Sequence, residues 1–126
     1  MILRDFIKQM RRIFRFKRGP TCQPRFLAEE PAVIKPGLIY IVGEEKCRWA
    51  AVFKCPCGCG DAVWLNLLQG HSPQWEVEQH TGGKISLSPS VNRIVGCRSH
   101  FFLWRNRIHW CLSRYPQTLH PPASRE

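Results

Sequence analysis

Beyond residue 20 the apolar residues fall in short runs that are rich in β-forming side chains, and turn residues separate these runs. Such runs are typical of β-strands, so we expect strands at 25–28, 38–42, 48–53, 63–67, 75–78 and 85–87. Residues 100–111 predict a closing hairpin with its turn at Asn106. No convincing helical period follows residue 20, so the pattern predicts a mainly β fold, a small and mostly antiparallel domain.

The first residues follow a different pattern, because apolar side chains recur there at three- and four-residue steps with basic residues between them. This spacing predicts an appended amphipathic helix at residues 2–17, which Gly19 and Pro20 would end. Such a helix packs on a protein surface or lies on an anionic membrane. We therefore divide the chain into a basic helix and linker (1–20), a β domain (21–115) and a C-terminal tail (116–126).

Length and charge narrow the class of protein without naming its chemistry. The 126 residues suit one domain, and the net charge is +10. Residues 1–18 contain seven basic residues and one acidic residue, which favours an acidic partner: nucleic acid, anionic lipid or an acidic protein surface. The sequence shows no secretory signal and no apolar run of membrane-spanning length, so we expect a cytoplasmic protein with reduced thiols.

Three of the seven cysteines stand within five residues, at Cys55, Cys57 and Cys59, and a fourth, Cys97, begins a C-x-x-H motif that ends at His100. Zinc prefers thiolate and imidazole ligands in a tetrahedron, supplied by a local cluster and a distant turn. The pattern predicts a zinc ion bound by these four cysteines, with His100 or Cys111 as alternative ligands. The H-E-x-x-H and H-x-E motifs of catalytic zinc sites do not occur, so we expect the metal to be structural.

A second polar cluster crowds hydroxyl groups around a proline, shortly before the C-x-x-H motif. A serine nucleophile needs a base within hydrogen-bond reach and donors for the oxyanion. The possible pairs combine one of four serines with His100 or His109, the serines being Ser86, Ser88, Ser90 and Ser99. Residue types alone favour a simple turn here. The remaining histidines, such as His80, are expected to be solvated loop residues.

Taken together and in this order, the segments 55–60, 85–91, 97–101 and 106–110 resemble the BubE family of small bacterial peptidases. These look like serine proteases that cut a ubiquitin-like modifier from its precursor or its conjugates. The resemblance covers roughly residues 25–111. It implies that the clustered cysteines and Cys97 bind zinc, and that Ser90 or Ser99 acts with His100, the Ser90 pair being geometrically easier. Asp61, after the cysteine cluster, would be a poor triad acid.

The resemblance therefore favours a zinc-containing serine peptidase whose partner is a ubiquitin-like protein. We expect backbone N–H groups near the Cys97 turn to hold the oxyanion. Two non-catalytic alternatives stay open: a zinc-stapled module that binds nucleic acid or an acidic protein, and an adaptor that recognises a ubiquitin-like tail without cutting it.

Overall fold

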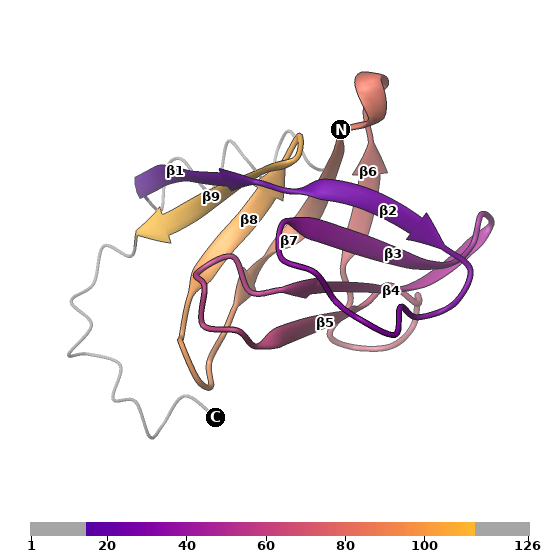
Figure 1. Cartoon of the computed structure of the whole chain (residues 1–126), viewed down its shortest axis with the longest axis horizontal. Coiled ribbons are helices and arrows are strands. Elements are labelled where there is room, and N and C mark those ends of the chain that lie inside the picture. Colours follow the sequence, from indigo (N-terminus) through magenta and orange to yellow (C-terminus); the bar gives the residue numbers. More distant parts are fainter. Residues whose placement is uncertain (1–14, 113–126) are drawn as a thin grey trace.

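The computed structural model describes residues 15–112, which form two β-sheets that face each other across a common core (Figure 1). The five-stranded sheet has the order β1-β9-β8-β7-β6, and the four-stranded sheet has the order β2-β3-β4-β5. The strands are β1 Arg15–Thr21, β2 Gln23–Leu27, β3 Leu38–Glu44, β4 Cys47–Lys54, β5 Ala62–Asn66, β6 Glu76–Gln79, β7 Ile85–Asn92, β8 His100–Trp104 and β9 Arg107–Leu112.

The predicted mainly β fold is confirmed. Within the described range the one helical element is the short 3-10 turn Thr81–Gly83, and no helix there is long and apolar enough to span a bilayer. The ladders are antiparallel except for the parallel pair β2 and β3. Except for β7, the first and last residues of each predicted strand lie within two residues of those of an observed strand. Strand β7 continues through the Ser-Pro-Ser segment to Asn92.

The predicted N-terminal helix is wrong where the structure describes it. Residues 15–17 belong to β1, which pairs with β9 so that Phe16 lies opposite Cys111. Gly19 permits this pairing, because a Cβ there would lie 2.6 Å from Nε1 of Trp110. Backbone hydrogen bonds to β9 override the helical spacing of the side chains. Residues 2–14 of the expected helix, and the expected tail from 116, lie outside the described residues.

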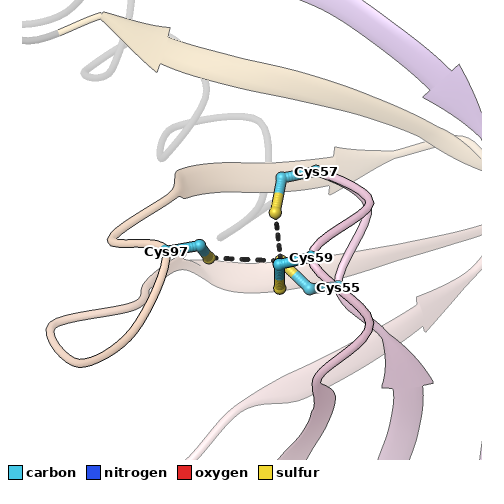
Figure 2. A group of neighbouring side chains, drawn as sticks. All are labelled: Cys55, Cys57, Cys59 and Cys97. Carbon is cyan, nitrogen blue, oxygen red and sulfur yellow. Dashed lines mark hydrogen bonds between the residues drawn. The ribbon is translucent and has the colours of Figure 1, made fainter.

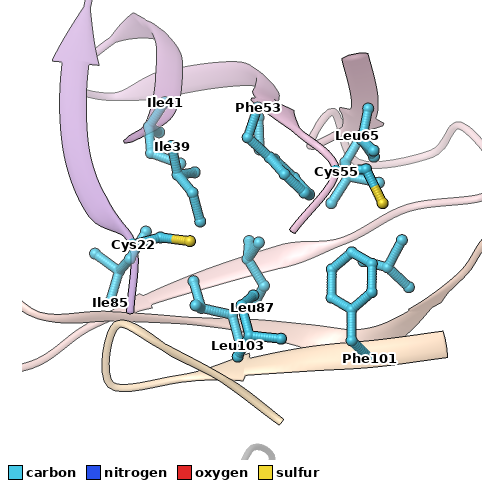
Figure 3. Close-up of a cluster of buried hydrophobic side chains, with 14 residues drawn as sticks. Cys22, Ile39, Ile41, Phe53, Cys55, Leu65, Ile85, Leu87, Phe101 and Leu103 are labelled. Carbon is cyan, nitrogen blue, oxygen red and sulfur yellow. The ribbon is translucent and has the colours of Figure 1, made fainter. Parts of the chain in front are cut away.

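The core is built by the inward-facing residues of both sheets, with Cys22 at the point where the chain passes from β1 to β2 (Figure 3). Phe53 of β4 meets Phe101 of β8 edge to face, with the ring centroids 6.1 Å apart. Both rings are 1% exposed. Edge-to-face pairs of this kind add about 0.5–1.5 kcal/mol to the free energy of burial, so this contact helps to hold the sheets together.

Candidate functional site

The three clustered cysteines lie on a tight loop between β4 and β5. Backbone hydrogen bonds from Cys55 N to Asp61 O (2.8 Å) and from Gly58 N to Cys55 O (3.2 Å) close this loop. Gly58 and Gly60 both have a φ of 89°, a left-handed conformation that glycine adopts without strain. The loop buries Cys55 and leaves Cys57 and Cys59 exposed. The sequence therefore folds the cluster into a knuckle with its thiols on one side.

The fourth cysteine approaches from the loop that joins β7 to β8. A hydrogen bond from Arg93 N to Ser99 O (2.7 Å) closes the neck of this loop, and Cys97 points from it toward the knuckle (Figure 2). The Sγ atom of Cys55 lies 3.4 Å from that of Cys57 and 3.6 Å from that of Cys97. All four sulfur atoms lie within 4.8 Å of one another. Two loops that are 42 residues apart in sequence thus converge on one point.

This donor set fits zinc. Four thiolates at about 2.3 Å from one tetrahedral Zn²⁺ lie about 3.8 Å from each other, close to the spacing of these sulfur atoms. Within the described part of the chain, the group that could hold a metal contains neither His100 nor Cys111. Cys111 lies on β9 and is buried, and burial raises the pKa of its thiol to about 12.

The thiols of the cluster differ in acidity. Burial raises the pKa of the Cys97 thiol, but hydrogen bonds from the hydroxyl and backbone of Ser99, and from Cys57 and Cys55, together lower it to about 6. Burial raises the pKa of Cys55 to about 12. Cys97 is therefore the thiol of this pair that loses its proton first.

A serine and a histidine meet beside this cluster. The Oγ atom of Ser90 on β7 lies 2.8 Å from Nε2 of His100 at the start of β8. The ladder carries a bulge at this point: between the pairs Leu87↔Leu103 and Val91↔Phe101, β7 advances four residues while β8 advances two. Bulges re-aim side chains in this way near active sites. The register before the bulge would set Ser90 opposite His100, and the two extra residues on β7 bring Asn92 opposite His100 instead.

The other candidate serines have different neighbours. Ser99 Oγ lies 3.1 Å from Cys97 Sγ and 4.0 Å from Cys55 Sγ, so this hydroxyl faces the thiols. Ser86 is fully buried, and its Oγ accepts a hydrogen bond from Arg105 N (2.9 Å). Ser88 is 7% exposed. Among these hydroxyls, Ser90 is the one that the structure sets against His100.

Two of the remaining histidines are also placed by side-chain contacts. His80 Nε2 lies 2.7 Å from Ser86 Oγ, and its ring meets Trp104 edge to face. The expectation of a solvated loop histidine is wrong here, because a strand pairing that local sequence does not reveal brings Ser86 to it. His109 stacks on Phe102, with 5.0 Å between ring centroids. Ser86 with His80 is a second serine–histidine pair, but its serine is inaccessible to solvent.

Sequence reasoning missed two residues at the site. Arg93 donates to Sγ of Cys97 (3.6 Å) and to Oδ2 of Asp61 (3.2 Å). Asp61 therefore forms an ion pair beside the thiols. Trp75 donates from Nε1 to the backbone oxygen of Ser90 (3.3 Å). A single Arg in a loop and a Trp 15 residues before the serine carry no local signal of these contacts.

The chain was compared with protein-family models, with curated proteins and with solved structures. The curated proteins and the solved structures each returned no match. Residues 26–111 match the model of the family described as "Bacterial ubiquitination-like system serine protease (BubE)". The match spans more than half of the 126 residues and includes the four clustered cysteines, Ser90 and His100. This chain therefore belongs to the BubE family.

Proposed function

We propose that this chain is a zinc-containing serine peptidase that cleaves a bacterial ubiquitin-like modifier from its precursor or its conjugates. Ser90 is the nucleophile and His100 the general base. The observation that carries the proposal is the 2.8 Å separation of Ser90 Oγ and His100 Nε2, within hydrogen-bond reach for proton transfer. The family description supplies the class of reaction and the modifier system.

In this mechanism Ser90 Oγ attacks the carbonyl carbon at the modifier's C-terminus, and Nε2 of His100 accepts the hydroxyl proton. The tetrahedral intermediate collapses as the imidazolium returns that proton to the departing amine, which leaves the modifier esterified to Ser90. Water then attacks the ester with His100 again as base. The products are a free modifier carboxylate, a free amine and the regenerated hydroxyl.

Asn92 is our assignment for the residue that orients His100. The two residues lie opposite each other in the β7–β8 ladder, and directly opposed residues project their side chains from the same face. Because Ser90 occupies the Nε2 side of the ring, an acceptor near Nδ1 would fix the tautomer that leaves Nε2 able to accept a proton. The carboxamide oxygen of Asn92 is such an acceptor.

The metal has a structural role in this proposal. Zinc, when bound, would be held by Cys55, Cys57, Cys59 and Cys97 and would cross-link the knuckle to the β7–β8 loop. That loop joins the strand that carries Ser90 to the strand that carries His100. We therefore assign Ser99 to the support of the thiolates and not to attack on the substrate. Reduced thiols of this kind suit the cytoplasm.

The nucleic-acid and membrane expectations rested on the basic residues 1–18 and on the helix at 2–17. Residues 1–14 lie outside the described range, and the family match does not extend to them. These findings give neither partner any support. A ubiquitin-like protein is the partner that the family description favours.

The test combines a fluorophosphonate probe, which labels activated serines, with cleavage of a fusion between the ubiquitin-like modifier and a reporter peptide. We expect the probe on Ser90 in the zinc-loaded protein, and loss of both labelling and cleavage in Ser90→Ala and His100→Ala. Ser72→Ala, an exposed loop substitution, is the matched control with wild-type behaviour. Persistent cleavage in Ser90→Ala, or a wild-type protein that binds the modifier without cutting it, would overturn the proposal.

A further inference from the structure

Arg93 occupies the junction between the thiol cluster and the serine–histidine pair. It follows Ser90 by three residues, and its backbone N–H closes the neck of the β7–β8 loop on the carbonyl of Ser99, next to His100. Its side chain turns the other way, toward the cysteines. Arg93 therefore contacts the thiols through its side chain, and through its backbone the residue that precedes His100.

The guanidinium of Arg93 is held in place on the cysteine side by three contacts. Its Nη1 donates to Sγ of Cys97 (3.6 Å) and of Cys59 (4.0 Å), and its Nη2 donates to Oδ2 of Asp61 (3.2 Å). The Arg93 side chain is 17% exposed and that of Asp61 is 55% exposed. Gly96, with a φ of 81°, lets the loop pass over this ion pair, since a Cβ there would lie 3.3 Å from Asp61 Oδ2.

A cation at this position has a clear electrostatic effect. Four thiolates around one Zn²⁺ leave a net charge of −2, so the thiolates repel one another at the site. A guanidinium that donates to two of the thiolates offsets part of that charge and holds both sulfur atoms in place. Arg is suited to the task because it stays charged and its planar fork can serve two acceptors at once.

We infer that Arg93 is a positioning residue that retains the metal and transmits its binding to the catalytic pair. The guanidinium holds the sulfur atoms of Cys97 and Cys59 in place by hydrogen bonds, and the backbone N–H of the same residue holds the loop neck from which His100 enters β8. Asp61 orients the guanidinium. This inference rests on the metal site and the Ser90–His100 pair of the proposed function, and it adds the residue that couples them.

Zinc affinity is the decisive readout, measured by competition with a chromophoric chelator on the full-length protein. Loss of a partner that orients metal ligands typically lowers metal affinity about 10- to 100-fold. We expect a loss in this range for Arg93→Gln, a smaller loss for Arg93→Lys, which keeps the charge but not the fork, and a partial loss for Asp61→Asn. Arg98→Gln changes an exposed arginine of the same loop and should keep wild-type affinity.

Cobalt substitution and probe labelling separate this inference from the proposed function. Wild type and Arg93→Gln should both show the thiolate-to-Co²⁺ charge-transfer band at saturating cobalt, which establishes that the variant folds and keeps its ligands. Labelling of Ser90 should fall in Arg93→Gln at limiting zinc and recover as zinc is added. Unchanged zinc affinity in Arg93→Gln would overturn the inference while leaving the peptidase intact. A wild-type protein without the cobalt band would overturn the metal site and this inference together, whereas Ser90 labelling would still report on the peptidase.

Discussion

Ser90 Oγ lies 2.8 Å from His100 Nε2, although the residue opposite His100 in the ladder is Asn92 and not Ser90. The two extra residues on β7 account for this difference, because a regular ladder continued from Leu87↔Leu103 would place Ser90 itself opposite His100. Two residues of β7 thus lie close to one histidine: the Ser90 hydroxyl is at Nε2, and Asn92 is the cross-strand partner of His100. This arrangement makes the role of Asn92 open to experiment.

We expect Asn92→Ala to lower kcat for modifier cleavage by at least about tenfold with little change in KM, because an imidazole without its orienting acceptor samples the wrong tautomer. Asn92→Asp, which keeps the acceptor, should retain more activity than Asn92→Ala. The pH dependence of kcat should shift in Asn92→Asp, since the added charge favours the imidazolium. Equal kcat in wild type and Asn92→Ala would exclude this role for Asn92.

Removal of the metal should loosen the β7–β8 loop before the core. Phe53 and Phe101 contact each other directly across the two sheets, whereas bound metal would cross-link the loop to the knuckle. After chelation we expect trypsin to cleave after Arg98 on the order of tenfold faster or more. Cleavage after Arg105, in the β8–β9 turn, is the internal control and should change little. Mass mapping of the fragments measures both sites; equal protection of Arg98 with and without metal would contradict the cross-linking role.

Asn106 should be an important residue for stability. It is 6% exposed with a φ of 66°, and its Oδ1 accepts a hydrogen bond from Ile85 N (2.8 Å). Loss of this acceptor leaves the buried N–H of Ile85 without a hydrogen-bond partner, which lowers stability by about 1–3 kcal/mol. We expect Asn106→Ala to lower the free energy of unfolding in urea by about this amount plus the strain of positive φ. Asn106→Gly removes the hydrogen bond without that strain, so its loss should be smaller; an equal loss would show that the conformation contributes nothing.

The thiol of Cys111 should resist alkylation in the native protein. Burial raises the pKa of its thiol from 9.0 to about 12, so at pH 8 iodoacetamide should alkylate exposed Cys47 and spare Cys111 until urea is added. The same difference in pKa makes the stability of the protein depend on pH. Above pH 9 the thiol loses its proton in the unfolded chain but keeps it in the folded one, so the free energy of unfolding falls between about pH 9 and 12. Cys111→Ala should reduce that loss. Rapid alkylation of Cys111 in the native protein at pH 8 would contradict this account.

Local sequence was sufficient for the features that depend on local chemistry. Short β-rich runs bounded by turn residues predicted the strands at 38–42, 48–53 and 63–67, because β-branched and aromatic side chains favour extended backbone. The spacing of Cys55, Cys57 and Cys59 likewise indicated a metal, since disulfides between cysteines this close in sequence would be strained. The helical spacing before residue 17 misled in the described part, where β9 offered a strand partner.

The tertiary structure alone decided which residues meet at the site. The choice of Ser90 over Ser86, Ser88 or Ser99 depends on how β7 pairs with β8, which sets the Ser90 hydroxyl against His100. The contact between Arg93 and Asp61 crosses 32 residues, and that between Cys55 and Cys97 crosses 42. Such pairings follow from how the two sheets pack and where their loops end, which no local periodicity encodes. The sequence by itself determined the kinds of side chain available for chemistry, and the fold determined which of them lie within reach of one another.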